Sequence, residues 1–326
     1  MNKESRILVT GAKGFLGTYV CERLESQGYL NVIKCDNNRQ TNGTTLMKTD
    51  KEFACDLRNR EDVQALMRMS RPDVVIHLAA RVGGIGANKE KPGTFIYDNL
   101  MMGVNLIECC KNVVDKFVLV GTVCSYPKYA QVPFEERCIW DGYPEETNAP
   151  YGIAKKTLTV MLNAYREEYG LNGITVIPVN MYGPGDNFDP KTSHVIPALI
   201  KKIDDAGKYD RVTIWGTGKA SREFLHVKDA ARAIVMAAEL YDKPDIVNIG
   251  TYDEIKISSL VSMIREVMGH QGEVLYDKDK PDGQPRRCLL TTKALKEFGF
   301  KSEISLENGL RDTVNWYISQ QERKNG

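Results

Sequence analysis

The chain has 326 residues, which is enough for a substantial core and for two domains. Its hydrophobic fraction of 42% and charged fraction of 27% are those of an ordinary soluble globular protein. With 44 Lys and Arg against 43 Asp and Glu, no excess of charge favours nucleic acid or a membrane surface as a partner.

Membrane-span, secretory and cysteine patterns narrow the class of protein further. No apolar run approaches the roughly 18 residues that a membrane span needs, and Met1 leads directly into a strand pattern rather than a secretory segment. The eight cysteines form no CxxC pair and no zinc-like spacing with histidine. We therefore expect a cytoplasmic protein with reduced thiols, without a bound metal and without a membrane partner.

The first half alternates short β-branched runs with helical patterns. Each apolar run is continuous rather than alternating, which is typical of parallel strands covered on both faces. Strand and helix in turn predict a Rossmann-type, doubly wound α/β domain. In chain order the predicted elements are strand Arg6–Thr10, helix 15–27, strand Val32–Cys35, helix Val63–Met69, strand Val74–Leu78, helix 95–112 and strand Phe117–Val120.

The second half begins with a long helical pattern over 151–169 and a strand, Thr175–Pro178, and then loosens into a loop rich in Gly, Pro, Asn and Asp. Short strands and helices return as strand Val212–Trp215, helix 229–240, strand Ile246–Ile249, helix 257–268 and helix 305–318. We expect a Rossmann domain from 1–178 and returning segments near 223–250. A smaller mixed α/β substrate-binding domain would come from 179–222 and 251–326.

Three glycines, Gly11, Gly14 and Gly17, lie between the first strand and the first helix. Glycine serves where φ is positive, where backbone approaches a pyrophosphate, and where a helix packs closely on a strand. The helix N-terminus then offers unpaired N–H groups to the phosphates. In this context the glycines predict a dinucleotide site, and the alternative is an ordinary turn before a helix.

A carboxylate follows the second strand at Asp36, about 20 residues after the glycines. Such a carboxylate accepts hydrogen bonds from the adenosine ribose and repels a 2′-phosphate, which favours NAD(H) over NADP(H). The neighbouring Asn37 is a further candidate contact, and Arg39 could still meet a phosphate. The alternative is that Asp36 only caps a turn.

Tyr151 and Lys155 are four residues apart at a helix start, and therefore lie on one face. A Lys ammonium beside a phenol is expected to lower the pKa of the phenol toward a range useful for proton transfer. Thr122, at the end of the preceding strand, could hold a carbonyl oxygen nearby. The spacing alone recurs at Tyr276 and Lys280, so the upstream glycine loop and the strand-end Thr122 carry the argument.

With these residues together, the sequence resembles the extended short-chain dehydrogenase/reductases over essentially its whole length. Dehydratases of that superfamily carry Asp-Glu after the strand-end Thr, where this chain has Val123-Cys124. A thiolate is a competent base beside a ketone, so Cys124 and the downstream His194 suggest proton exchange at carbons next to a carbonyl. The alternatives are a buried core cysteine and a histidine with a plain capping role.

Longer stretches resemble the GDP-L-fucose synthase family, which epimerises GDP-4-keto-6-deoxymannose at C3 and C5 and reduces it at C4. That resemblance implies Cys124 as the epimerisation base, His194 as the acid, Tyr151 and Lys155 as the reduction pair, and Thr122 in place of the usual Ser. The matching stretches are RVGGIGAN (81–88), VCSYPK (123–128), PYGIAKK (150–156), NMYGPGDNF (180–188), SHVIPALI (193–200), WGTGKASREFLHV (215–227) and PDGQPRR (281–287).

The same resemblance implies two sets of binding residues. Arg and Lys suit a diphosphate, which needs several charge-assisted donors, although Trp215 could equally be core and Arg222 and Arg287 solvated surface charges. Besides the glycines, Asp36, Asn37, Arg39, Tyr151 and Lys155, the implied cofactor contacts are Phe15, Leu16, Asp56, Leu57, Leu78, Ala79 and Ala80. The implied substrate contacts are Val82, Gly83, Asn180, Asn187, Val195, Lys202, Trp215, Arg222 and Arg287.

One departure from the resemblance concerns the cofactor, because the family usually uses NADPH, with a basic or small polar residue at the place of Asp36. Asp there is more typical of relatives that keep NAD bound throughout a cycle. We therefore expect 3,5-epimerisation and C4 reduction of a GDP-4-keto-6-deoxy-hexose by NAD(P)(H). The alternatives are a GDP-sugar 3,5-epimerase or 4-dehydrogenase with captive NAD, or a non-catalytic dinucleotide-binding module. The resemblance also implies a homodimer through helices 95–112 and 151–169.

Overall fold

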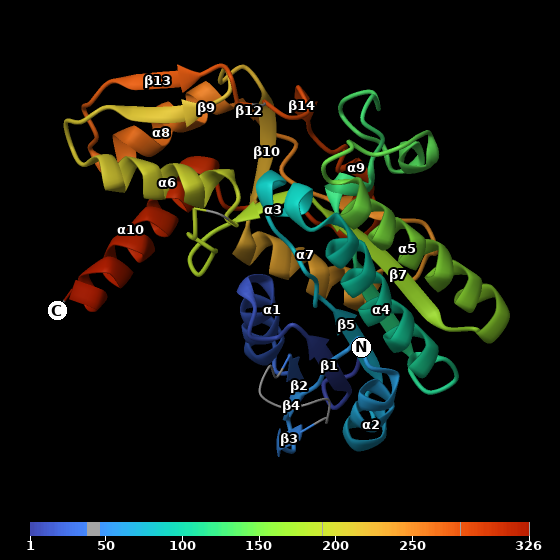
Figure 1. Cartoon of the computed structure of the whole chain (residues 1–326). Coiled ribbons are helices and arrows are strands. Elements are labelled where there is room, and N and C mark those ends of the chain that lie inside the picture. Colours follow the sequence, from blue (N-terminus) through green and yellow to red (C-terminus); the bar gives the residue numbers. More distant parts are fainter. Residues whose placement is uncertain (38–45, 191, 281, 326) are drawn as a thin grey trace.

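A computed structural model describes residues 1–37, 46–190, 192–280 and 282–325, and Arg39 lies outside these ranges. Within them the chain forms a larger lobe around one eight-stranded sheet and a smaller lobe with two short sheets (Figure 1). The predicted fold class, a Rossmann-type α/β domain with a smaller mixed domain, is confirmed.

The large sheet has the strand order β11-β7-β6-β5-β1-β2-β4-β3. All neighbouring strands are parallel except the pair β3–β4. The bounds are β1 Arg6–Thr10, β2 Asn31–Asp36, β3 Leu46–Thr49, β4 Glu52–Ala54, β5 Val74–His77, β6 Lys116–Val120, β7 Asn172–Pro178 and β11 Val247–Ile249. Strand order reverses between β1 and β5, so ligands are expected at the carboxyl ends of these two strands.

Helices cover both faces of this sheet. On one face α1 (Phe15–Ser26) and α7 (Val227–Leu240) pack over a core that includes Val20, Leu24 and Ile234. On the other face α2 (Arg60–Ser70), α4 (Pro92–Cys110) and α5 (Ala149–Tyr169) enclose a second core around Leu66, Leu106 and Leu158. Two apolar faces explain why the strands read as continuous apolar runs.

Local signals fix several helix ends. The Asn59 side chain accepts hydrogen bonds from the N–H groups of Glu61 and Asp62 at the start of α2. Helix α5 has Pro150 in its first turn and ends on Gly170, whose φ is 70°. These ends matter for the site because α5 carries Tyr151 and Lys155 at its first turns.

The smaller lobe holds a third core built on Ile200, Leu260 and Val314. Its first sheet has the order β12-β10-β14, with β8 also pairing with β10, and its second is β13-β9. The strands are β8 Asn180–Tyr182, β9 Val212–Trp215, β10 Ser221–His226, β12 Glu254–Lys256, β13 Val274–Asp277 and β14 Arg286–Arg287. The remaining helices are α3 Ile85–Glu90, α6 Val195–Ala206, α8 Ile257–Met268, α9 Thr292–Phe298 and α10 Leu306–Asn325, with 3-10 turns η1 Val123–Ser125 and η2 Glu136–Trp140.

The structure contains elements that the sequence did not predict, and some of them change the expected site and domains. Helix α6 follows directly on the loop rich in Gly and Pro, where no helix was expected. Strand β10 belongs to the small sheet, and α9 contributes Ala294 and Phe298 to the core of the larger lobe. The predicted domain boundaries stay a proposal, and these contacts favour moving 223–226 to the smaller lobe and 292–300 to the larger one.

Candidate active site

The glycine loop lies at the reversal of strand order, as a dinucleotide site requires. Gly11 has a φ of 70°, and a Cβ there would lie 3.0 Å from backbone atoms of Ala79. A Cβ on Gly17 would lie 2.0 Å from the carbonyl oxygen of Gly11. Gly14 precedes α1 without any side-chain cap, so the first-turn N–H groups, which include those of Phe15 and Leu16, remain available to a pyrophosphate.

Three further predicted cofactor contacts, Leu78, Ala79 and Ala80, follow β5. Leu78 N–H donates to the carbonyl of Thr10 at 3.3 Å, and Ala79 N–H donates to its hydroxyl at 3.3 Å. Ala80 comes next in the chain, so the segment 78–80 lies against the glycine loop. These residues fit a bound dinucleotide because they leave backbone, rather than bulky side chains, at the switch between β1 and β5.

Asp36 ends β2 beside this loop, and its Oδ2 accepts a hydrogen bond from Lys13 N–H at 2.8 Å. Burial raises the pKa of the Asp36 carboxyl, while Lys13 and Lys48 act in the opposite direction. Asn37 is exposed directly after the strand. The Asp36 carboxylate therefore caps a turn, as the alternative stated. That turn is the glycine loop, which is part of the predicted dinucleotide site.

Asp56 and Leu57 follow β4, the next strand along this edge. The Arg58 side chain donates to both carboxylate oxygens of Asp56 at 2.9 and 2.7 Å, and these hydrogen bonds hold the pKa of Asp56 below its usual range. Leu57 is buried. Both predicted residues thus lie near the adenosine end of the predicted site, with the Asp56 side chain already paired.

Thr122, Tyr151 and Lys155 come together where β6 ends against the start of α5. The Thr122 hydroxyl hydrogen-bonds with the Tyr151 phenol, and Lys155 is 2% exposed. Burial and the neighbouring Cys124 raise the pKa of Tyr151 well above its usual range, with the Thr122 hydrogen bond acting against them. Burial also lowers the pKa of Lys155 to about 8. The pKa of Tyr151 is therefore raised, not lowered as expected from a nearby Lys155, because burial disfavours the phenolate.

Cys124 lies in η1, two residues after Thr122, whose hydroxyl accepts the Cys124 N–H at 3.2 Å. Its thiol is partly exposed, and Arg287 Nη1 lies 3.6 Å from the sulfur. Arg287 is buried, and its Nε donates to Gln284 Oε1 at 3.3 Å. The structure thus excludes the alternative of a core cysteine, and also that of Arg287 as a solvated surface charge.

His194 is the residue before α6, and not part of a continuing loop as expected. The side chain is accessible to solvent, yet desolvation by the surrounding protein lowers the pKa of the imidazole, and Arg287 lowers it further. Arg287 therefore acts electrostatically on His194 and contacts Cys124. The predicted base, Cys124, and the predicted acid, His194, thus both lie within the influence of the Arg287 guanidinium.

The predicted diphosphate residues divide into two groups. Arg222 in β10 is in register with Arg287 in β14, and burial together with Arg287 lowers the pKa of Arg222 to about 10. Lys202 Nζ lies 4.8 Å from the ring centroid of Trp215, which is 58% exposed and therefore not core. The first group adjoins Cys124, whereas the second forms its own cation–π contact on the smaller lobe.

The other predicted substrate residues are spread along the same region. Asn180 Nδ2 donates to the Glu223 carbonyl at 3.1 Å, and Asn187 Nδ2 donates to the Thr192 hydroxyl at 2.8 Å. Val82 is exposed in the loop after β5, Gly83 follows it, and Val195 opens α6. Asn187 therefore organises the loop before His194 in this structure.

Sequence reasoning missed the buried supports of the site. The Glu223 carboxylate accepts N–H groups of Thr251, Tyr252 and Leu289 at 2.5, 2.8 and 2.7 Å, which ties β10 to the chain after β14. Gln284 fixes Arg287 and donates its amide to the Lys128 carbonyl at 2.9 Å. Gln284 and Glu223 lie in the matching stretches PDGQPRR and WGTGKASREFLHV, but no local pattern marks either residue as a support of the site.

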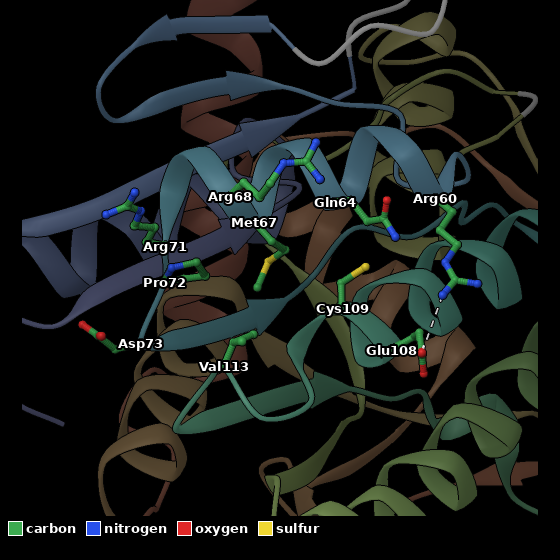
Figure 2. Close-up of a pocket in the computed structure, with 10 residues that line it drawn as sticks. All are labelled: Arg60, Gln64, Met67, Arg68, Arg71, Pro72, Asp73, Glu108, Cys109 and Val113. Atoms are coloured by element: carbon green, nitrogen blue, oxygen red, sulfur yellow. Dashed lines mark ion pairs between the residues drawn. The ribbon is translucent and has the colours of Figure 1, made fainter.

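A hollow of about 820 Å³ elsewhere contains none of the predicted site residues. It lies between α2 and the end of α4, with Arg60 paired to Glu108 at 3.6 Å (Figure 2). Asp73, which also lines it, directly precedes β5, so the hollow is at the amino edge of the sheet. Within the described ranges no helix is long and apolar enough to cross a membrane, and no group of three or more His, Cys, Asp or Glu could hold a metal ion.

A glycine loop at a Rossmann switch point, joined to a Thr–Tyr–Lys set at the neighbouring strand end, defines a nicotinamide-dependent enzyme of the extended short-chain dehydrogenase/reductase class. The model of the NAD dependent epimerase/dehydratase family matches residues 7–250. The chain belongs to this family. It is also similar to the GDP-L-fucose synthase of Sinorhizobium fredii, with 38% identity over 317 residues, which is 96% of each chain. The predicted resemblance is confirmed.

Solved structures agree with this assignment. The crystal structure of a GDP-6-OMe-4-keto-L-xylo-heptose reductase from C. jejuni has a TM-score of 0.87 and 28% identity, and the match covers 98% of this chain and 99% of that one. A GDP-L-fucose synthetase from Naegleria fowleri bound to NADP has a TM-score of 0.84 and 27% identity, covering 99% and 96%. Both proteins share the two-lobe architecture over nearly their whole length.

Proposed function

We propose that this enzyme epimerises a GDP-4-keto-6-deoxy-hexose at C3 and C5 and then reduces it at C4. The observation that carries the proposal is the convergence of Cys124 with the Thr122–Tyr151 pair, while Arg287 lies 3.6 Å from the sulfur. The relatives named as GDP-L-fucose synthases, at 36–38% identity over nearly the whole chain, support the same substrate class.

For epimerisation, the Cys124 thiolate takes the proton from C3 or C5, and the electron pair moves onto the C4 oxygen to give an enolate. Thr122 and Tyr151 donate hydrogen bonds to that oxygen, which is where negative charge develops. Protonated His194 returns a proton to the carbon from the opposite face. These two proton transfers invert the configuration of the carbon. Cys124 and His194 then exchange protons with solvent.

For reduction, a nicotinamide held at the glycine loop would supply a hydride to C4. Tyr151 donates its phenolic proton to the C4 oxygen, so the ketone becomes an alcohol and a phenolate remains. Lys155 is buried one helical turn after Tyr151 in α5, and it returns a proton from solvent to the phenolate. The raised pKa of Tyr151 keeps the phenol protonated before hydride arrives, which suits a proton donor.

For the cofactor, we favour NADP(H) with modest discrimination. The N. fowleri relative was solved with NADP, and Lys13 and Lys48 supply positive charge beside Asp36. The Asp36 carboxylate opposes that charge and limits the preference for the 2′-phosphate. We further propose a cytoplasmic homodimer that uses α4 and α5. The eight free thiols support the cytoplasmic location.

The direct test uses Cys124→Ser and GDP-4-keto-6-deoxymannose in deuterated water without reductant. We expect the rate of deuterium incorporation at C3 and C5 to fall by at least a hundredfold, because serine is not ionised at neutral pH. Cys138→Ser, at a second partly exposed cysteine, serves as the matched control and should exchange at the wild-type rate. Incorporation at full rate in the Cys124 variant would remove the thiol from its role.

A further inference from the structure

The loop after β5 touches the segment that precedes His194. Gly84 N–H donates to the Thr192 carbonyl at 3.1 Å. A Cβ built on Gly84 would lie 2.8 Å from the Ser193 carbonyl oxygen, a separation that real Cβ atoms essentially never show. Ser193 is the residue directly before His194. The larger lobe therefore meets the backbone directly before the candidate acid, at a position that accepts only glycine without a shift.

Conformational freedom does not explain this glycine. Gly84 has φ −66° and ψ 176°, which any residue adopts, and it is the residue before α3. The close approach of Ser193 is the remaining reason for a missing side chain. Gly86, two residues later, offers a contrast, because a Cβ there would meet nothing within 4 Å.

On the larger lobe the turn is held firmly. The Asn88 side chain, which is 3% exposed, donates to the carbonyls of Gly83 and Gly84 at 2.8 and 3.1 Å. At its start, Arg81 exchanges hydrogen bonds of 3.0 Å with the Asn99 side chain of α4. The loop is thus anchored to two helices and does not yield readily to an added methyl group.

On the smaller lobe, backbone hydrogen bonds also hold Thr192, Ser193 and His194. Thr192 and Ser193 N–H both donate to the Asp189 carbonyl, at 3.1 and 2.8 Å. The His194 carbonyl then accepts Ala198 N–H at 3.0 Å in the first turn of α6. Movement of Ser193 is therefore passed directly to His194 and to the start of its helix.

We propose that Gly84 is a positioning residue for epimerisation, because its missing side chain sets the place of the His194 imidazole. The inference rests on the proposed function of His194 as the acid. A methyl group at position 84 displaces Ser193 and moves the imidazole from the carbon that it protonates. A misplacement of about 1 Å in a catalytic group costs on the order of a hundredfold in rate.

The test compares Gly84→Ala with the matched control Gly86→Ala. Deuterium incorporation into GDP-4-keto-6-deoxymannose at C3 and C5 is measured without reductant, together with KM and the dissociation constant of NADPH. We expect Gly84→Ala to exchange at least tenfold more slowly, with KM and NADPH binding within threefold of wild type. Gly86→Ala should match wild type in all three. Exchange at the wild-type rate in Gly84→Ala would overturn the proposal.

Two further variants separate the possible failures. His194→Asn in the same assay tests the proposed acid alone, so wild-type exchange there counts against His194 rather than against the Gly84 contact. If Gly84→Ala lowers the melting temperature markedly, Asn88→Ala decides, because it loosens the turn without adding an atom near Ser193. For Asn88→Ala we expect slower deuterium exchange than in the wild type, with NADPH binding intact. Equal loss of exchange and of NADPH binding in that variant would indicate a merely structural role and overturn the proposal.

Discussion

Lys155 illustrates how burial sets the chemistry of one residue. It is 2% exposed, and desolvation lowers its pKa from 10.5 to about 8. Below pH 8 the lysine is charged in both the folded and the unfolded protein, so the folded state bears the full cost of burying the charge. That cost shrinks as pH rises from 8 toward 10.5, where the unfolded chain also loses its proton.

We therefore predict that Lys155→Met abolishes reduction and yet stabilises the fold at neutral pH. The fall in pKa from 10.5 to about 8 corresponds to about 3 kcal/mol of folding free energy. The gain should be complete at pH 7 and should vanish above pH 10.5. Urea unfolding of both proteins across this range measures it, and equal stability at pH 7 would contradict the prediction.

We predict that the Asp36 carboxylate limits the preference of the enzyme for NADPH over NADH. Removing its negative charge should favour the 2′-phosphate, because Lys13 and Lys48 would then act without an opposing carboxylate. Asp36→Ala is expected to raise the ratio of kcat/KM for NADPH over NADH by at least tenfold, whereas the wild type should discriminate by less than about tenfold. Steady-state kinetics with the two cofactors decides the matter. An unchanged ratio in the variant would show that Asp36 does not read the ribose.

Among the elements, the contact between η1 and α5 holds the two half-reactions together. A Cβ on Gly152 would lie 2.3 Å from the Cys124 carbonyl oxygen. The Ser125 hydroxyl donates to the Gly152 carbonyl at 2.9 Å, which closes the contact from the other side. Because Tyr151 is next to Gly152, one backbone contact sets the distance between the thiol and the phenol.

Gly152→Ala is predicted to separate these elements and to impair both epimerisation and reduction. We expect a loss of about 1–3 kcal/mol in the free energy of unfolding, as for other overpacked sites. Gly93→Ala is the control, because that position opens α4 and a Cβ there meets nothing within 4 Å. Chemical denaturation and deuterium exchange measure the two effects. A Gly152 variant that behaves like the Gly93 variant would refute the steric argument.

How far the sequence predicts these elements depends on whether the signal is local. Strands Arg6–Thr10 and Val212–Trp215 are found at the predicted bounds, because their apolar runs are bounded by turn residues. Helix α6 was missed because Pro197 reads as a breaker after a loop-like stretch. Proline is tolerated in the first turn, where the N–H groups have no intrahelical partner.

The same distinction applies to the site. Tyr151 and Lys155 were predictable, since one helix start carries both. The contact of Arg287 with Cys124 joins residues 163 positions apart, through a two-residue strand that no periodicity can reveal. The charge states were also beyond prediction, because burial by distant segments raises the pKa of Tyr151 and lowers that of Lys155.

On the scale of the whole molecule, α4 and α5 pack side by side on the outside of the larger lobe (Figure 1). They expose Tyr97 and Val160, which are 58% and 54% accessible. Exposed apolar side chains on one helix pair favour contact with a second copy. This surface supports the proposed homodimer.

Val160→Asp is expected to convert the dimer to a monomer, because a carboxylate would be buried at the interface without a partner. Leu240→Asp, an equally exposed site at the end of α7, should leave the dimer intact. Light scattering after size exclusion distinguishes the 36.7 kDa chain from its dimer. A wild-type protein that is monomeric at micromolar concentration would refute the proposal.

Strand β14 spans only Arg286–Arg287, yet its parallel register with β10 sets the Arg287 guanidinium beside that of Arg222. Two like charges at close range repel, and a dianion between them would turn that repulsion into attraction. Ligand binding and folding are thereby linked. GDP should raise the melting temperature while guanosine should not, and added salt should shrink the effect of GDP. Scanning calorimetry with both ligands would detect this linkage, and equal shifts would speak against it.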